Sequence, residues 1–260
     1  MNFLNQNALL GFLLVVLLPT ASVFGLSCLV RRVAPLAWLR RNNEVGGYKY
    51  QAVSAIYAVL LGFVVVAVWE RFHEAEGQVT TEATAWTTLN RLSIGLPEAA
   101  AAGVREAVLG YLDLTVQREW PAMARGEALP EAGLALTEVT RRYLAIVDDS
   151  SRTQTVVSKS IDLLAGISQA RRARLGAMAG SVPKVLWFSL VAGTVIMVAF
   201  SFFLASENLL GQAFMTAMVA FTVTSLLYVA VLLDQPFSGP ASISSLPLEH
   251  AASVFRAGRT

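Results

Sequence analysis

The chain has 260 residues, of which 55% are hydrophobic and 15% charged, and its formal net charge is +2. Soluble domains carry about 25% charged residues, so this composition indicates a membrane protein. The small net charge, with arginines not interleaved with aromatic residues, argues against a nucleic-acid-binding protein. One cysteine and two histidines exclude an intrachain disulfide, and we expect neither a metal site nor a cofactor.

The first predicted membrane helix covers Leu9–Val30, with a kink expected near Pro19. The run is too long for a signal-peptide core and has no basic leader before it. A connector follows in which five basic residues accompany one acid, Glu44. Its apolar part, residues 35–39, is expected to lie among lipid headgroups. The basic residues of the connector are Arg31, Arg32, Arg40, Arg41 and Lys49.

The second predicted span begins with a run of nineteen uncharged residues, 51–69. At about 1.5 Å per residue, this run is long enough to cross a hydrocarbon core of roughly 30 Å. No proline follows before Pro97, so we predict one helix from Tyr50 to Leu92, the first half in lipid and the second in water. Along its second half, apolar residues recur at alternating spacings of four and three residues, and this spacing is typical of the seam of a coiled coil. The seam would comprise Val65, Trp69, Phe72, Glu76, Val79, Ala83 and Trp86, with Glu76 as its polar member.

Residues 71–182 predict a helical domain outside the membrane. Helices are expected at Glu98–Val116, closed by residues 118–121, at Glu131–Val147, and from caps at 148–151 to Arg174 or beyond. The first of these would bury Val104, Val108, Tyr111, Leu112 and Thr115. The last would pack Val157, Ile161, Leu164, Ile167 and Ser168 against the seam, forming an antiparallel stalk continuous with the membrane.

The third and fourth spans are expected at Val185–Ala205 and Leu210–Leu233, joined by a turn at 206–208 as an antiparallel hairpin. Small residues would let these two spans approach closely: Gly193, Ala199, Gly211, Ala217 and Ala220. A polar tail follows, with disorder expected after about Ser253. The predicted class is therefore an all-α membrane protein. It divides into the first two spans (1–70), a helical extramembrane domain (71–182), a membrane hairpin (183–234) and a tail (235–260).

Candidate functional residues lie on the second span, where Ala55, Ala58 and Gly62 form a small-residue face that ends at Trp69 and Glu70. This face could line a pore, with Glu70 in a ring of carboxylates that attracts cations. In the structural alternative, Glu70 pairs with a neighbouring basic residue or marks the end of the span. Tyr57 could hydrogen-bond a neighbouring helix or face a conduit.

Asp234, at the end of the fourth span, is the second candidate, because acids at a membrane boundary are often functional. In the structural alternative it bonds backbone amides freed at the exit turn, or pairs with Arg71 or Lys184. The sequence contains no phosphate loop, nucleophile elbow or zinc-protease pattern. We therefore expect no enzymatic activity.

Several motifs are similar to those of one family. They are Tyr57–Val65 with Val68-Trp69-Glu70, Glu82-Ala83, Glu119-Trp120-Pro121, and Leu233-Asp234-Gln235-Pro236-Phe237-Ser238-Gly239. From about Asn43 to Leu248 the chain resembles the bacterial bestrophin-like integral membrane proteins, catalogued as a domain of unknown function. The resemblance implies the layout of bestrophins, which are oligomeric anion channels with four membrane helices and a large helical domain between the second and third. The chain departs from bestrophins in lacking a proline-containing hydrophobic neck, so conduction is implied by analogy alone.

Two functions remain open. One is a homo-oligomeric channel for inorganic ions, with the second helix lining the pore. The other is a non-conducting sensor or scaffold, anchored in the lipid bilayer, that binds a partner through its helical domain. The expected location is a bacterial inner membrane. The basic first connector favours a cytoplasmic loop and a large domain on the extracytoplasmic side, whereas true bestrophins place that domain in the cytosol.

Overall fold

The computed structural model describes residues 8–41 and 43–257, which form helices and connecting segments without a strand. These residues divide into two compact units. The first contains the described residues up to Arg71 together with Gly180–Asp234, and the second contains Phe72–Ala179 and the described residues from Gln235 onward. The predicted all-α class is confirmed. Four helical segments, Leu9–Val33, Asn43–Gly95, Lys184–Ser201 and Leu209–Leu233, are long and apolar enough to span a membrane.

Helix α5 (Asn43–Leu92) contributes to both units and has 50 residues without a break. The single long helix expected from Tyr50 to Leu92 is thus confirmed, and it starts seven residues earlier than predicted, at Asn43.

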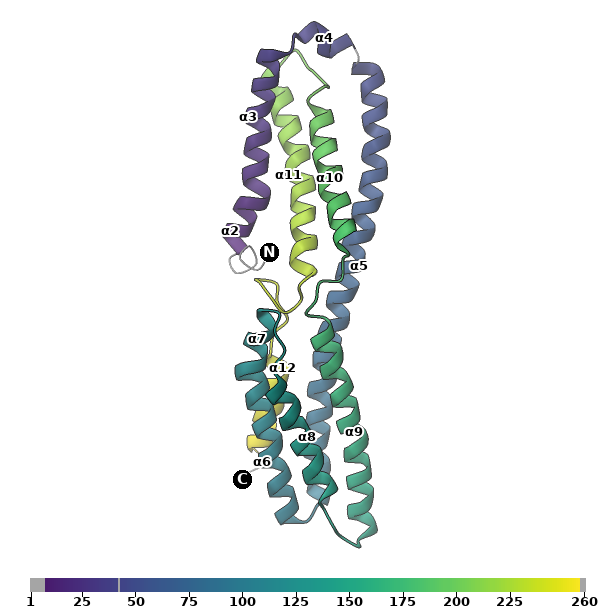
Figure 1. Cartoon of the computed structure of the whole chain (residues 1–260), viewed down its shortest axis with the longest axis vertical. Helices are drawn as coiled ribbons and strands as arrows, with labels where there is room; N and C mark the ends of the chain where they lie inside the picture. The colour runs from purple at the N-terminus through teal and green to yellow at the C-terminus, as the bar shows by residue number, and fades with distance from the viewer. Residues whose placement is uncertain (1–7, 42, 258–260) are drawn as a thin grey trace. The chain divides into compact units, whose positions relative to one another are not determined.

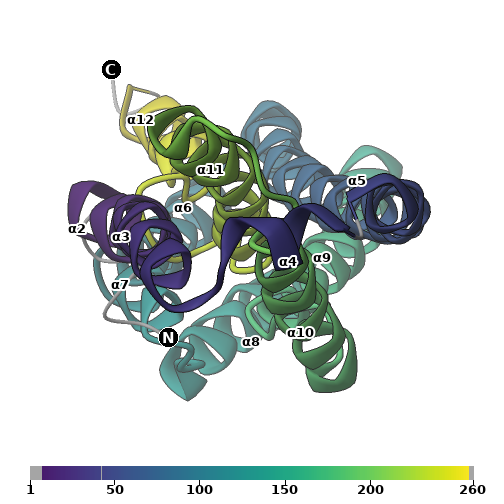
Figure 2. The ribbon, with the colours of Figure 1, turned by 90° about the horizontal axis from the view of Figure 1, so that it is seen from above.

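The first unit consists of the membrane-spanning helices and their connectors (Figures 1 and 2). Its elements are α2 (Ala8–Phe12), the π-helical turn η1 (Leu13–Leu17), α3 (Leu18–Val33), α4 (Leu36–Arg41), the first part of α5, α10 (Lys184–Ser201) and α11 (Leu209–Leu233). The π turn ends two residues before Pro19, whose missing N–H would interrupt an α-helical ladder. Helix α3 packs against α11, and α4 crosses from α3 towards α5 at one end of the unit (Figure 2).

The third span is shorter than predicted, because α10 ends at Ser201 rather than Ala205. The connector to α11 is therefore 202–208, not the turn 206–208. Asn43 explains this difference: its side-chain amide donates to the Ala205 carbonyl at 2.7 Å and accepts from the Ala205 N–H at 3.1 Å. The Asn43 side chain thus satisfies both backbone polar groups of Ala205, so α10 can end before Ala205.

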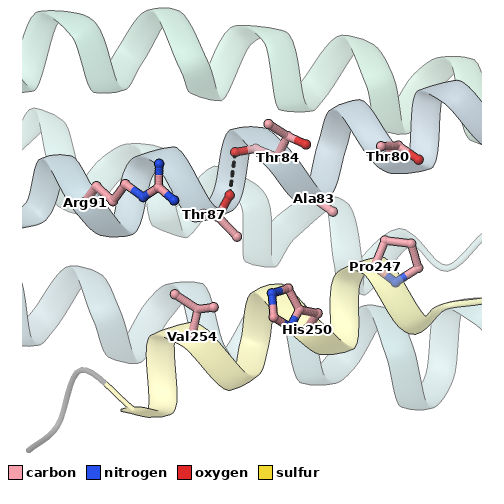
Figure 3. Close-up of a pocket in the computed structure, with 8 residues that line it drawn as sticks. All are labelled: Thr80, Ala83, Thr84, Thr87, Arg91, Pro247, His250 and Val254. Carbon is pink, nitrogen blue, oxygen red and sulfur yellow. Dashed lines mark hydrogen bonds between the residues drawn. The ribbon is translucent and has the colours of Figure 1, made fainter.

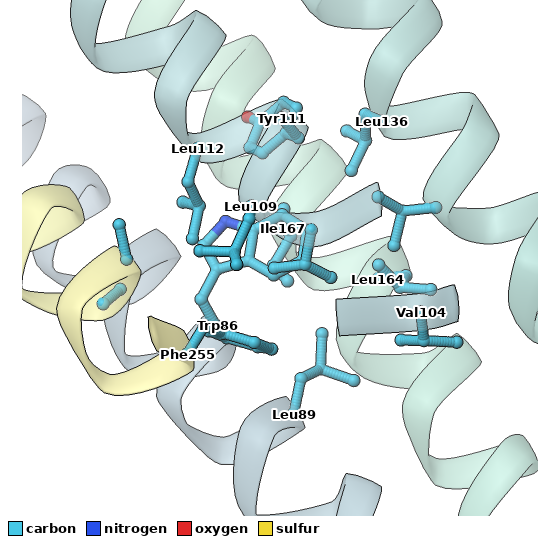
Figure 4. Packing of buried hydrophobic residues seen from close by; sticks show 14 of the residues in the cluster. Trp86, Leu89, Val104, Leu109, Tyr111, Leu112, Leu136, Leu164, Ile167 and Phe255 are labelled. Carbon is cyan, nitrogen blue, oxygen red and sulfur yellow. The ribbon is translucent and has the colours of Figure 1, made fainter. Parts of the chain in front are cut away.

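The second unit is a helical bundle around an apolar core (Figure 4). Its elements are the rest of α5, η2 (Ser93–Gly95), α6 (Glu98–Leu114), the π-helical turn η3 (Thr115–Glu119), α7 (Trp120–Ala124), α8 (Pro130–Leu144), α9 (Ser151–Gly176) and α12 (Leu246–Ala257). All five residues predicted for the buried face of the first helix are buried, as are Leu164 and Ile167 of α9. Trp86 stacks beside Tyr111 in this core, with ring centroids 5.1 Å apart.

The prediction that residues 118–121 close the helix that begins at Glu98 is wrong. The chain continues through η3 and α7 to Ala124. The π turn ends at Glu119, two residues before Pro121. Pro121 therefore falls in the first turn of α7, a position that tolerates a residue without an N–H. Helix α8 ends at Leu144, three residues before the predicted Val147.

The predicted coiled-coil seam is wrong in two of its members. Trp69 is 62% exposed, and Glu76 is exposed beside His73. In the second unit the buried side of α5 instead passes through Ala75, Val79, Glu82, Ala83, Trp86 and Leu89. The buried polar member is therefore Glu82, a residue whose charge needs a partner inside the bundle.

The expected disorder after Ser253 is also wrong for the described residues. Helix α12 extends to Ala257 and buries Leu248, Ala251, Ala252 and Phe255 in the core of the second unit. These residues recur at steps of three and four, which places them on one face of a helix. The polar residues between them had hidden this pattern.

Candidate functional site

The membrane-spanning part of α5 presents two different faces. One face packs within the first unit: Tyr57, Leu61, Val64 and Val68 are each at most 6% exposed. They contact apolar residues of α10 and α11, including Leu190 and Leu227. The tyrosine hydroxyl lies 3.0 Å from the Leu190 carbonyl and 2.7 Å from the Thr194 hydroxyl. Of the two roles considered for Tyr57, the structure shows the hydrogen bond to a neighbouring helix.

Gly193 of α10 lies directly against the ring of Tyr57. A Cβ atom at this position would come within 2.5 Å of two ring carbons. The glycine was expected to bring the third and fourth spans together, but it accommodates Tyr57 of α5. An aromatic ring can occupy this place because the facing residue has no side chain.

The candidate pore residues lie on the other face of α5. Ala55, Ala58, Gly62, Trp69 and Glu70 are all exposed in the single chain. A side chain at Gly62 would meet no atom within 4 Å. Because residues 55, 58, 62 and 69 are three, four and seven positions apart, they share one side of the helix. Neither Glu70 nor Arg71 forms an ion pair within the described part of the chain.

Asp234, at the end of α11, holds the segment that leads into α10. The carboxylate is 6% exposed. Its Oδ1 accepts from the N–H of Ser181 at 2.7 Å, the hydroxyl of Ser181 at 3.0 Å and the N–H of Val182 at 3.0 Å. Its Oδ2 accepts from the indole N–H of Trp187 at 3.3 Å. The amides bound are those of the entry to the third span, not of the exit turn, and within the described residues no ion pair joins Asp234 to Arg71 or Lys184.

The residues after Asp234 form a turn in the second unit. The Gln235 carbonyl accepts from the Ser238 N–H at 3.1 Å, and the Pro236 carbonyl accepts from the Ile243 N–H at 2.8 Å. Phe237 is buried edge-on against Trp120. Gly239 has a φ of 84°, a conformation that residues with a Cβ rarely adopt. The side chains of Asp234 and Phe237 and the backbone of Gly239 thus have structural roles in this motif, and the Ser238 hydroxyl donates to the Gln235 side-chain oxygen at 2.9 Å.

The second unit contains a buried ionic cluster that the sequence did not indicate. Arg174 of α9 is fully buried, as are Glu82 of α5 and Glu119 of η3. The arginine Nε donates to Glu82 at 2.9 Å, and one Nη donates to Glu119 at 3.0 Å. Its guanidinium also lies 4.9 Å from the ring centroid of Trp120, a cation–π contact. Burial alone would lower the pKa of Arg174, but the carboxylates of Glu82 and Glu119 raise it above its ordinary value, so the arginine stays charged.

Two further side chains complete this cluster. Arg171 pairs with Glu119, and the hydroxyl of Tyr111 donates to Glu82 at 2.6 Å. Burial raises the pKa of Tyr111 well above its ordinary value, and the Glu82 carboxylate raises it further, so the phenol remains a donor. Two arginines thus compensate two glutamates inside the bundle. The sequence signals were Glu82, an acid three residues after buried Val79 on the apolar side of α5, and Glu119; both belong to the motifs that resemble the family, and neither motif names the arginines.

A groove of about 270 Å³ lies between α5 and α12 in the second unit (Figure 3). Its lining contains Arg91 and His250 but no acidic residue; the other lining residues are Thr80, Ala83, Thr84, Thr87, Pro247 and Val254. The hydroxyls of Thr80 and Thr87 already donate to carbonyls of their own helix. Within the described residues, no group of three or more potential metal ligands occurs.

These features define a class: an all-α, multi-span membrane protein with four spanning helices and a helical bundle inserted between the second and third. The family model described as a Bestrophin-like domain matches residues 17–248. The chain therefore belongs to the bestrophin-like family.

Solved structures show the same fold. A crystal structure of a substituted variant of a bacterial bestrophin homolog from Klebsiella pneumoniae superposes with a TM-score of 0.74 at 15% identity, covering 91% of this chain and 99% of that chain. Another crystal structure of the Klebsiella pneumoniae homolog gives a TM-score of 0.69 at 16% identity, covering 92% of this chain and 96% of that chain. At these identities the likeness establishes the fold alone. A search of curated proteins found no match.

Proposed function

We propose that the protein is an oligomeric ion channel of a bacterial inner membrane and that the exposed face of α5 lines its pore. One observation carries this proposal. The span buries Tyr57, Leu61, Val64 and Val68 inside the chain and leaves the small-residue face without a partner. Four spanning helices are too few to enclose a conduit, so a pore needs several copies around an axis. A ring of α5 helices would place Ala55, Ala58 and Gly62 at that axis.

The charge at one end of this face suggests which ions would be favoured. Glu70 directly follows Trp69 where the uncharged run ends. A ring of such carboxylates raises the local concentration of cations and lowers that of anions over about one Debye length, ~8 Å at physiological salt. We therefore propose that Glu70 contributes to cation preference. No catalytic step is proposed, because no nucleophile and base are brought together at this face.

The test is ion flux through the purified protein in liposomes, together with its stoichiometry in nanodiscs. We expect a closed oligomer that conducts. Under a KCl gradient, Glu70→Gln should shift the reversal potential away from the potassium equilibrium value, and Gly62→Leu should reduce conductance. Glu106→Gln, which removes an exposed acid from α6, is the matched control and should change neither.

Three results would contradict the proposal. A monomer in nanodiscs, or an assembly whose centre is filled with lipid, would favour the sensor or scaffold. A conducting oligomer indifferent to both α5 substitutions would keep the channel but move the pore elsewhere.

We also propose that the basic connector between α3 and α5 is cytoplasmic, which places the second unit on the extracytoplasmic side. Five basic residues in a short connector support this orientation, because short loops rich in Lys and Arg are retained in the cytoplasm.

A further inference from the structure

One end of the first unit carries an excess of positive charge. The last turn of α3 contains Arg31 and Arg32, and the last turn of α4 contains Arg40 and Arg41. We call these four arginines the basic end. Figure 1 shows α4 crossing from α3 to α5 at this end, beside the connector of α10 and α11. Arg31 and Arg40 both reach Glu207 of that connector, so the two helix ends that carry the four arginines lie near the same residue.

The basic end rests on a well-defined scaffold. Leu39 of α4 is 3% exposed, and Trp38 meets Phe203 edge-on with ring centroids 6.4 Å apart. Glu207 of the facing connector pairs with Arg40 at 2.5 Å, and its carbonyl accepts from Arg31 at 3.4 Å. These contacts join α4 to the connector between α10 and α11.

The scaffold does not neutralise the charge. The single carboxylate of Glu207 is used by Arg40, and Arg31 bonds a carbonyl rather than an acid. Arg32 and Arg41 are exposed, and neither has an ion-pair partner among the described residues. Two unpaired guanidinium groups, each able to donate two parallel hydrogen bonds to a phosphate, remain available.

Apolar side chains surround these charges. Val33 is 80% exposed, Trp38 54% and Val45 59%. All three stand where apolar spans end, which is the level at which tryptophan is enriched in membrane proteins. A ligand that binds both parts of this surface needs an anionic phosphate to pair with the arginines and a hydrocarbon part to contact the apolar side chains.

We propose that the basic end binds the headgroup of an anionic phospholipid, with Arg32 and Arg41 holding the phosphate and Trp38 covering the glycerol and upper acyl chains. Clusters of basic residues next to a membrane helix attract anionic lipids by about 1 kcal/mol for each Lys or Arg, which corresponds to about fivefold in affinity. This binding does not depend on whether the protein conducts.

The test uses the full chain in neutral detergent, titrated with phosphatidylglycerol or phosphatidylcholine and followed by native mass spectrometry. We expect preferential binding of phosphatidylglycerol. Arg32→Gln with Arg41→Gln should weaken that binding by about 25-fold and weaken phosphatidylcholine less, because its own ammonium group already neutralises its phosphate. Trp38→Ala should weaken both lipids alike, since the ring carries no charge.

The matched control is the pair Arg71→Gln and Lys184→Gln, which removes the same charge at the opposite ends of the spans α5 and α10. This variant should keep the full preference for phosphatidylglycerol at the basic end. An equal loss in both double variants would show non-specific charge attraction and overturn the proposal. Competition by millimolar inorganic phosphate would also overturn it, because the site would then bind a soluble oxyanion rather than a lipid.

Discussion

Removing the charge of Arg174 is the most informative perturbation of the second unit. The substitution Arg174→Met keeps most of the volume of the side chain but leaves its two carboxylate partners in place. Glu119 retains Arg171, whereas Glu82 retains only the hydroxyl of Tyr111. Since Glu82 is fully buried, the variant contains a charge with neither a counter-ion nor water around it.

The size of the penalty can be worked from this geometry. Leaving one partner of a buried ion pair uncompensated costs about 3–5 kcal/mol. We therefore expect the variant to lose about 3–5 kcal/mol in its free energy of unfolding. For a chain of this size that corresponds to a fall in melting temperature of about 10 °C.

A second substitution distinguishes this mechanism from simple loss of packing. The stability of each variant is measured by thermal unfolding of the purified protein in detergent. Adding Glu82→Gln to the variant should restore most of the lost stability, because the uncompensated charge is gone.

Arg172→Met is the control, since Arg172 lies on the same helix but is exposed, with its side chain on Ser168. The reasoning is refuted if Arg174→Met lowers the melting temperature no more than this control does. It is refuted equally if adding Glu82→Gln gives no rescue.

Two other outcomes follow from the first unit and from the proposed orientation. Asp234→Asn replaces the oxygen that faces the indole of Trp187 with a second donor, so we expect the free energy of unfolding to fall by about 1–3 kcal/mol. Exposed Asp149→Asn should have no effect on thermal unfolding. Equal behaviour of the two variants would contradict the role of Asp234 in holding the segment that leads into α10. In a Cys28→Ser background, Glu127→Cys should react with a membrane-impermeant thiol reagent in intact cells. Protection until lysis would reverse the orientation and put the second unit in the cytosol, as in true bestrophins.

The buried charges mark where sequence reasoning failed. The sequence analysis places Glu76, not Glu82, as the polar member of the seam, and it expects Arg174 only near the end of a helix. The local sequence around Glu82 and Arg174 does not show whether each charge faces water or pairs with a counter-ion. Their partners lie far away in the chain: Glu82 and Arg174 are 92 residues apart. Their burial depends on which helices pack together, and that is a property of the whole bundle.

Local and tertiary information therefore decided different things about this protein. The sequence by itself determined the class, the number of spans and the unbroken helix α5, because lipid demands long apolar runs with internally satisfied backbones and these are visible in one dimension. Only the tertiary structure decided that Tyr57 faces Gly193, that Asp234 holds the entry of α10, and that the last twelve described residues form a packed helix. These features rest on contacts between distant segments, whose partners no local pattern specifies.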